Sequence, residues 1–109
     1  MHVIEQIRAG VVVLEPRAAI TAETEADLQD AVERHFSAGR VNLLLDLSHV
    51  SYIDSCGLGR IVQTYVSAQR LGGSLKLMNV SGRNRQLLTV TRVLSVLEIH
   101  QPSEHAVGA

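Results

Sequence analysis

The chain has 109 residues, a formal net charge of −1 and a composition that is 46% hydrophobic. This length suits one domain with a substantial core. The near-neutral charge excludes a general electrostatic attraction to nucleic acid or to anionic membranes. Because only 3% of the residues are aromatic and none is Trp, the core must consist mainly of Val, Leu, Ile and Ala.

A single cysteine, Cys56, rules out an internal disulfide and fits a reducing compartment. The first ten residues lack the basic start and apolar stretch of a signal peptide. No segment approaches the roughly 18 consecutive apolar residues of a membrane span. We therefore expect a soluble, cytoplasmic protein.

The first third of the chain predicts a β-hairpin followed by a helix. Residues 2–20 hold two β-rich segments that meet at Gly10. After them, Thr21 or Thr24 can cap a helix that has early acidic residues and a stop at Gly39. The inward positions of this helix follow helical spacing and are Leu28, Ala31, Val32 and His35.

The middle of the chain predicts a buried strand and a second helix. Residues 41–47 form a continuous apolar run, typical of a strand covered on both faces. The helix that follows has an apolar face and ends at Gly72 and Gly73. Its predicted inward residues are Leu58, Ile61, Val62, Tyr65 and Val66.

The last third continues the alternation. Residues 74–80 predict a strand, residues 83–94 a third helix and residues 95–100 a short edge strand. Strands that alternate with helices indicate an α/β sheet with parallel pairs. The inward residues predicted for the third helix are Leu87, Leu88 and Thr91.

Ser55 stands where the second helix should begin. We interpret it as the N-cap, whose hydroxyl accepts a hydrogen bond from the amide of Gly57 or Leu58. The positive end of a helix, with its unpaired N–H groups, is also a good seat for a phosphate. Each glycine in a helix costs about 1 kcal/mol relative to alanine. We therefore interpret Gly57 and Gly59 as clearing space for a macromolecule at Ser55, although Gly59 could instead pack closely against the sheet.

The longer segment that contains Ser55, residues 43–62, resembles the signature of the STAS domain, specifically of bacterial anti-sigma factor antagonists. That signature is an apolar strand, Asp-x-Ser, a Val, an apolar residue and then Asp-Ser-x-Gly-Leu-Gly. Residues 70–81 also resemble the Gly-Gly-strand segment of the family. The signature positions here are Asp46, Ser48, Val50, Ile53, Asp54, Ser55, Gly57, Leu58 and Gly59.

The resemblance implies a fold. It predicts a single STAS-like α/β domain over residues 1–100, with a flexible tail over residues 101–109. The sheet is expected to be mixed, with about four to five strands and with the helices packed mainly on one face.

The resemblance also implies a protein-binding switch without catalytic activity. In the family, an anti-sigma factor that is also an ATP-dependent serine kinase phosphorylates the Ser of Asp-Ser-x-Gly, here Ser55. The unmodified antagonist binds the anti-sigma factor and frees the sigma factor, phosphorylation prevents this binding, and a serine phosphatase reverses it. The expected partner-binding residues are Asp54, Ser55, Cys56, Gly57, Leu58, Gly59 and Arg60.

Two acidic residues near Ser55 have more than one interpretation. Asp54 could steer the Ser55 hydroxyl toward ATP, or it could accept hydrogen bonds from backbone amides of the loop. The sequence favours neither role over the other. Asp46 is expected to bond backbone in the loop after its strand. The family usually has Gly-x-apolar-Asp after its second strand, with the Asp linked to efficient phosphorylation, whereas residues 18–21 here contain neither Gly nor Asp.

Other functions find less support in the sequence. The alternative within the fold is a non-switching accessory or scaffold subunit, for example of a lipid or anion transporter. Cys56 could sense redox state, but an inert small residue is the favoured interpretation. The histidines have no paired spacing for a metal, and no nucleotide-binding loop is present, so no metal or cofactor is expected. A hydrolase lacks its Gly-x-Ser-x-Gly elbow, and a receiver domain lacks its late lysine, since none follows Lys76.

Overall fold

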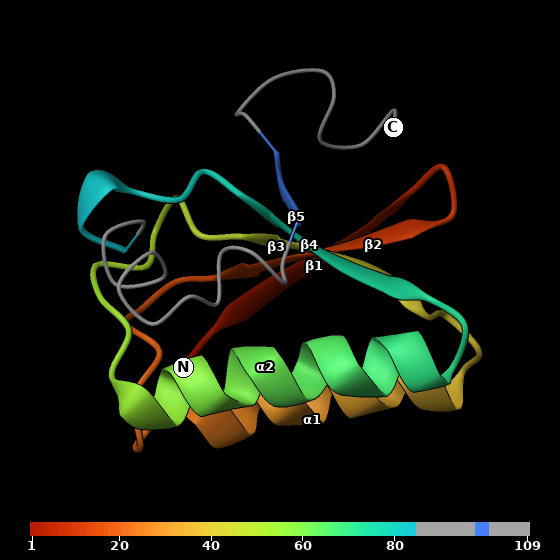
Figure 1. The fold of residues 1–109 in the computed structure, drawn as a ribbon, viewed down its shortest axis with the longest axis horizontal. Helices are drawn as coiled ribbons and strands as arrows, with labels where there is room; N and C mark the ends of the chain where they lie inside the picture. The colour runs from red at the N-terminus through yellow and green to blue at the C-terminus, as the bar shows by residue number, and fades with distance from the viewer. Residues whose placement is uncertain (85–97, 101–109) are drawn as a thin grey trace.

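Over the residues that the structure describes, a five-stranded sheet has two long helices against one face (Figure 1). The computed structural model describes residues 1–84 and 98–100. The strands lie in chain order, with β1 antiparallel to β2 and the remaining neighbours parallel. This confirms the predicted mixed sheet, and the two long helices described both lie on one face, as predicted. The elements are β1 (Val3–Arg8), β2 (Val11–Pro16), α1 (Glu25–Ser37), β3 (Asn42–Asp46), α2 (Ser55–Arg70), β4 (Ser74–Met78) and β5 (Glu98–His100).

The hairpin predicted around Gly10 is confirmed. β1 and β2 pair from Val3 opposite Pro16 to Arg8 opposite Val11. The two residues of the turn, Ala9 and Gly10, both have positive φ, of 51° and 79°. Positive φ at both central residues gives a tight turn whose twist matches that of the two strands.

Helix α1 buries the face that its spacing predicts. Thr24 occupies the N-cap position, but its side chain makes no capping hydrogen bond, so neither predicted threonine acts as a side-chain cap. The Thr24 hydroxyl instead donates to the carbonyl of Ala19. The chain leaves the helix through Gly39, at φ 82°, as predicted. The buried residues of α1 are Leu28, Ala31, Val32 and His35.

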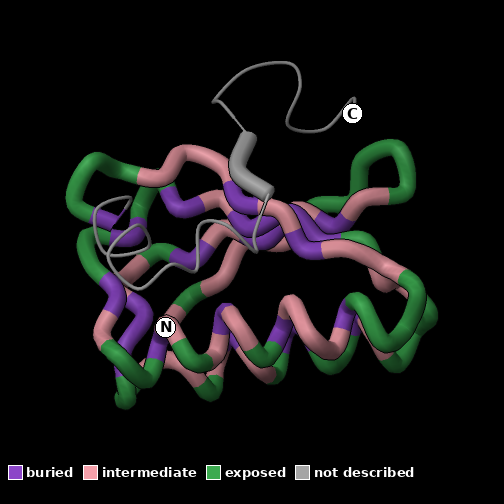
Figure 2. The backbone as a smooth tube through the Cα atoms, in the orientation of Figure 1, coloured by how far each residue is buried: buried purple, intermediate pink, exposed green. Residues whose placement is uncertain are grey.

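Helix α2 buries only part of the stripe predicted for it: of the five residues expected to face inward, Ile61 is fully buried. Val62 and Val66, expected to face inward, are only half-buried, and Leu58 and Tyr65 are partly buried against the core. Small side chains on the buried face let the helix lie close to its neighbours. The prediction selected large apolar side chains instead, because it relied on hydrophobicity alone. The buried residues of α2 are Gly57, Ile61, Thr64 and Ala68. Figure 2 shows buried segments of the helices on the side that faces the sheet.

The core lies between the sheet and the two helices. All three leucines of β3, Leu43 to Leu45, are buried, which confirms a strand covered on both faces. β5 confirms the predicted edge strand and pairs with β4. Most of the third helix predicted over residues 83–94 lies outside the described residues. The tail predicted over residues 101–109 lies wholly outside them.

A buried histidine ties α1 to the edge strand β1. His35 Nε2 lies 2.6 Å from Glu5 Oε1, and Arg40 Nε donates to His35 Nδ1 at 2.9 Å. Arg34 pairs with the other Glu5 oxygen at 3.1 Å. Burial works to raise the pKa of Glu5, but hydrogen bonds from Arg34 and His35 outweigh it, so the pKa falls below its ordinary value of 4.5.

Candidate functional site at the start of helix α2

Asp54, and not Ser55, is the N-cap of α2. Its Oδ1 accepts a hydrogen bond from the amide of Gly57 at 2.8 Å, and its backbone is extended, as a cap requires. Ser55 is the first helical residue, so the predicted capping role for its hydroxyl is wrong. Asp and Ser are about equally good caps, and here the side chain one position earlier reaches the amide.

The second oxygen of Asp54 binds a distant loop. Oδ2 accepts from the amide of Ala22 at 3.1 Å, in the connection between β2 and α1. The pKa of Asp54 is lowered below its ordinary value of 3.8, chiefly by the Gly57 N–H, with smaller contributions from the amides of Ala22 and Cys56. Of the two roles considered for Asp54, the structure shows the satisfaction of loop amides.

The connection between β2 and α1 lies directly against the start of α2. Ile20 forms a parallel bridge with Ile53, donates to the carbonyl of Tyr52 at 3.1 Å and accepts from Asp54 at 3.2 Å. A Cβ built on Gly57 would overlap the carbonyl oxygen of Ile20. The space beside Gly57 is therefore filled by the protein's own backbone, and its interpretation as space for a partner is wrong.

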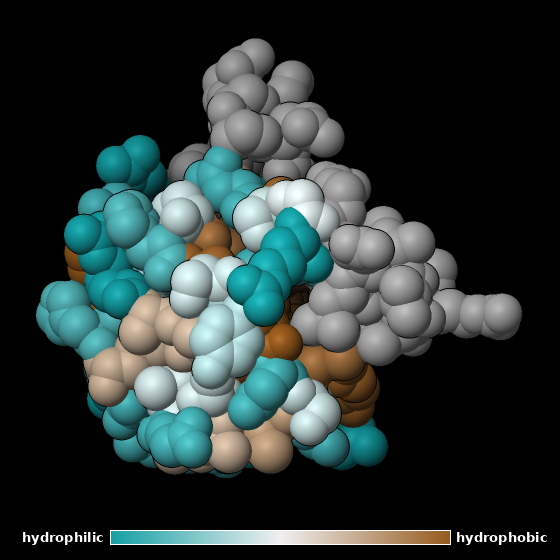
Figure 3. Space-filling model, turned by 90° about the vertical axis from the view of Figure 1, so that its left-hand side faces the viewer, coloured by the Kyte–Doolittle hydropathy of each residue, from teal (hydrophilic) through white to brown (hydrophobic). Residues whose placement is uncertain are grey.

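The open surface at this end is formed by Ser55, Cys56 and Gly59, which are all exposed. A Cβ on Gly59 would meet nothing within 4 Å, as expected of a residue that clears space. Within the described part of the chain, the Ser55 hydroxyl makes no hydrogen bond. Figure 3 views this end of the molecule, where hydrophilic and near-neutral side chains cover most of the coloured surface.

The remaining predicted partner-binding residues are less accessible. Leu58 is half-buried and packs against the core. Arg60 is also half-buried, and its Nε lies 2.6 Å from Glu25 Oε2 in the first turn of α1. This ion pair joins the two helices near their N-terminal ends.

The Asp-x-Ser part of the signature has a structural role. Asp46 Oδ1 accepts from the Ser48 amide at 3.0 Å and from Asn79 Nδ2 at 2.9 Å. The prediction that Asp46 bonds backbone in its loop is confirmed. The link to Asn79 was not predicted, because it joins residues 33 positions apart.

Two surface residues near the site also escaped sequence reasoning. Ala22 meets Asp54 from 32 positions away in the chain. The Tyr52 side chain is 43% exposed, and the Arg83 guanidinium lies 5.7 Å from its ring centroid. Nothing in the local pattern around either residue indicates such a contact.

Within residues 1–84 and 98–100, no helix combines the length and the apolar character needed to cross a membrane. The same residues contain no group of three or more side chains that could hold a metal ion.

Comparisons with known proteins agree with this geometry. The model of the STAS domain family matches residues 2–106. An anti-sigma-B factor antagonist of Bacillus subtilis is 41% identical over 66 residues, which are 61% of this chain and 61% of that protein. The matched region thus spans less than two thirds of that relative.

Solved structures share the fold. A protein from Thermotoga maritima described as an anti-sigma factor antagonist superposes with a TM-score of 0.87 at 25% identity, over 94% of this chain and 88% of that one. The Bacillus cell fate determinant SpoIIAA in its phosphorylated form gives a TM-score of 0.75 at 13% identity, over 95% and 94% of the two chains. At that identity, the likeness to SpoIIAA is one of fold alone. Since the family model covers nearly the whole chain, the chain belongs to the STAS domain family of anti-sigma factor antagonists.

Proposed function

We propose that the chain is an anti-sigma factor antagonist that is switched by phosphorylation of Ser55. Its partner is an anti-sigma factor with serine kinase activity, a serine phosphatase restores the unmodified form, and the chain itself acts by binding and not by catalysis. Such an ATP-dependent switch on a sigma factor operates in the cytoplasm. The observation that carries the proposal is the exposed Ser55 hydroxyl, which is left free because Asp54 caps the helix.

The position of Ser55 suits a phosphate. A phosphoserine adds a charge of about −1.5 to −2 at neutral pH. In the first turn of α2 this charge interacts favourably with the helix dipole, by up to about 2 kcal/mol. Since no acidic residue lies within the first turn itself, the modified domain should remain folded.

The same phosphate opposes binding of a partner. An interface centred on Ser55, Cys56 and Gly59 would bury the phosphate next to the ionised Asp54, whose lowered pKa keeps it charged. Burial of like charges without partners is costly. A loss of about 3 kcal/mol in binding free energy corresponds to roughly a hundredfold weaker complex.

The departure from the family pattern at residues 18–21 has a partial counterpart nearby. Thr21 is buried, and its hydroxyl donates to Glu23 Oε2 at 2.8 Å. Glu23 is exposed and lies in the connection that Asp54 ties to α2 through Ala22. An acidic side chain is thus present two positions after the place where the family has its Asp.

The test compares three baits in a pull-down from native lysate. We expect Ser55→Ala to retain an ATP-binding serine kinase and Ser55→Asp to lose it. Ser51→Asp adds the same charge at an exposed position of the preceding loop and should behave like wild type. The purified kinase should then phosphorylate wild type, with the phosphate mapped to Ser55 by mass spectrometry. If all baits retain the same transporter or scaffold proteins, the switch is refuted and the accessory role is favoured.

A further inference from the structure

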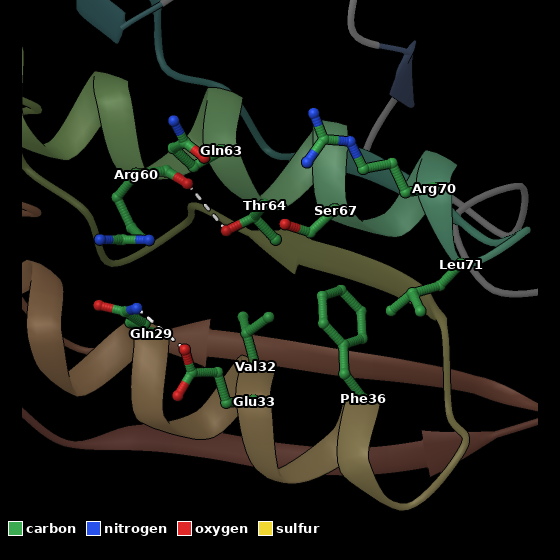
Figure 4. A pocket seen from close by; sticks show the side chains of 10 residues that line it. All are labelled: Gln29, Val32, Glu33, Phe36, Arg60, Gln63, Thr64, Ser67, Arg70 and Leu71. Carbon is green, nitrogen blue, oxygen red and sulfur yellow. Dashed lines mark hydrogen bonds between the residues drawn. The ribbon is translucent and has the colours of Figure 1, made fainter.

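A groove runs between α1 and α2 on the side of the helices that faces away from the sheet. Its volume is about 410 Å³, within the usual range for binding pockets of roughly 300–1,000 Å³. Val32 and Phe36 of α1 and Thr64 of α2 form its floor, and Leu71 closes one end (Figure 4). The polar residues along its rims are Gln29, Glu33, Arg60, Gln63, Ser67 and Arg70.

The groove is long and straight. The two helices run in the same direction (Figure 1), and the Arg60–Glu25 ion pair joins them at one end. From Arg60 to Arg70, the last residue of α2, the helix rises by about 15 Å at 1.5 Å per residue, and Leu71 extends the groove slightly beyond it. This is the length of an α-helix of about three turns.

The two walls carry opposite charge. α2 contains no acidic residue, and because Arg60 is paired with Glu25, the unpaired charge of α2 beside the groove, among the described residues, is that of Arg70. The α1 wall contributes Glu33, whose carboxylate accepts from Gln29 at 2.9 Å. Of the other acidic residues of α1, Glu25 is paired with Arg60 and Asp27 with the N-terminal amino group, which leaves Asp30, and the helix also carries Arg34.

The end of the groove farthest from Ser55 is the most accessible to a partner. Leu71 is 54% exposed, although it is a large apolar side chain. Its neighbour Arg70 is exposed and, among residues 1–84 and 98–100, has neither a hydrogen bond nor an ion pair. A free cation beside exposed apolar surface favours a ligand that offers both a carboxylate and an apolar side chain.

We propose that this groove binds an amphipathic α-helix of a partner protein. The helix is about three turns long, with an apolar stripe on the floor, acidic residues along the edge that faces α2 and basic residues along the edge that faces α1. A second copy of this chain is a poorer occupant. If two copies met through this face, each would present a concave groove to the other, and neither groove would be filled. The site is distinct from the proposed switch, although α2 carries both, so one partner could occupy Ser55 and the groove together.

The probe is a pair of stapled helical peptides of about three turns with the same composition. The matched peptide carries Glu on the edge facing α2 and Lys on the edge facing α1, and the swapped peptide exchanges these edges. Binding to the full chain is followed by fluorescence anisotropy and by amide chemical shifts. We expect the matched peptide to shift amides around Phe36 and Leu71 and to bind about tenfold more tightly than the swapped one, since several exposed charge pairs change sign.

Matched variants separate the contributions of charge and apolar contact. Arg70→Glu should abolish or reverse the preference between the peptides, whereas Gln69→Glu, which adds charge on α2 outside the groove, should preserve it. Leu71→Ser should weaken the matched peptide severalfold, whereas Ile7→Ser, at the similarly exposed Ile7, should not. All four variants are checked for folding by thermal unfolding.

Three results would overturn the proposal. One is equal binding of both peptides, a second is shifts confined to the Ser55 end, and a third is self-association of the wild type that Arg70→Glu disrupts. Ser55→Asp is measured in parallel and should leave the peptide affinity within about twofold. If the groove proposal is wrong, the peptide assay therefore shows it. If the phosphorylation switch is wrong, only the pull-down shows it.

Discussion

The N-terminal ends of α1 and α2 lie at the same end of the molecule but use their polar side chains differently. Before α1, the hydroxyls of Thr21 and Thr24 are held by Glu23 and by the Ala19 carbonyl. At α2, a carboxylate makes the cap, and the neighbouring Ser55 hydroxyl is left exposed. The proposed phosphorylation site thus differs from the two threonines in that the fold leaves its hydroxyl without a partner in the described part of the chain.

The largest expected effect is that of Gly57→Ala. Its Cβ would overlap the Ile20 carbonyl oxygen, so the connection before α1 must move away from α2, at a cost of about 3 kcal/mol. Gly59→Ala is the matched control on the same helix. It meets open space and should stabilise the protein by about 0.5–1 kcal/mol. Urea unfolding measures both, and equal effects would show that the two helix ends are not packed together as described.

Thr24→Ala should come next. The Thr24 hydroxyl donates to Ala19 at 2.7 Å and accepts from the Thr21 amide at 2.9 Å. Loss of both hydrogen bonds should reduce the free energy of unfolding by about 1–2 kcal/mol. Thr24→Ser keeps the hydroxyl and should lose less than half as much in the same unfolding measurement.

A smaller effect is expected from Asp54→Asn. The amide oxygen can still cap Gly57, but its NH₂ group cannot accept from Ala22. Because the folded-state pKa of Asp54 is lowered, its stabilising contribution is present above the unfolded-state value near 3.8 and is lost as the pH falls through the folded-state pKa. The stability difference between wild type and Asp54→Asn should therefore be constant from about pH 7 to pH 5 and should close at more acidic pH.

The pH dependence is measured by urea unfolding of both proteins, with Asp30→Asn on the exposed face of α1 as the matched control. A difference that persists unchanged into acid would contradict the charged cap.

The smallest expected effect on stability is that of Ser55→Ala. Since its hydroxyl has no partner within the described part of the chain, the change in unfolding free energy should stay within about 0.5 kcal/mol. A loss similar to that of Thr24→Ala would show that Ser55 serves the fold, and the contrast between the two helix ends would disappear. Thermal unfolding of the two variants side by side provides this measurement.

The parts of the fold that depend on local pattern could be predicted from the sequence. The hairpin at Gly10 and the whole buried face of α1 follow from turn chemistry and spacing. Of the buried face of α2, only Ile61 could be predicted, because Gly57, Thr64 and Ala68 are inward for their small size and not for their hydrophobicity.

For the proposed site, the motif indicated the segment that begins α2 but not the structural role of each residue in it. Whether Asp54 or Ser55 caps α2 depends on which side chain reaches the Gly57 amide, a difference of one position between two good caps. The purpose of Gly57 depends on Ile20, which is 37 residues earlier in the chain. Only the folded molecule shows that these two residues touch.

The hydrogen bonds around His35 have a consequence for the open edge of the sheet. An arginine side chain can only donate, so the Arg40 contact fixes the ring proton of His35 on Nε2, where it faces Glu5. Detaching β1 would leave that buried N–H without its acceptor until the Glu5 of another molecule replaced it, at a cost of about 1–3 kcal/mol in the detached state. Edge strands are common sites of strand exchange and aggregation. The histidine therefore opposes the detachment of β1 that any strand exchange would have to begin with.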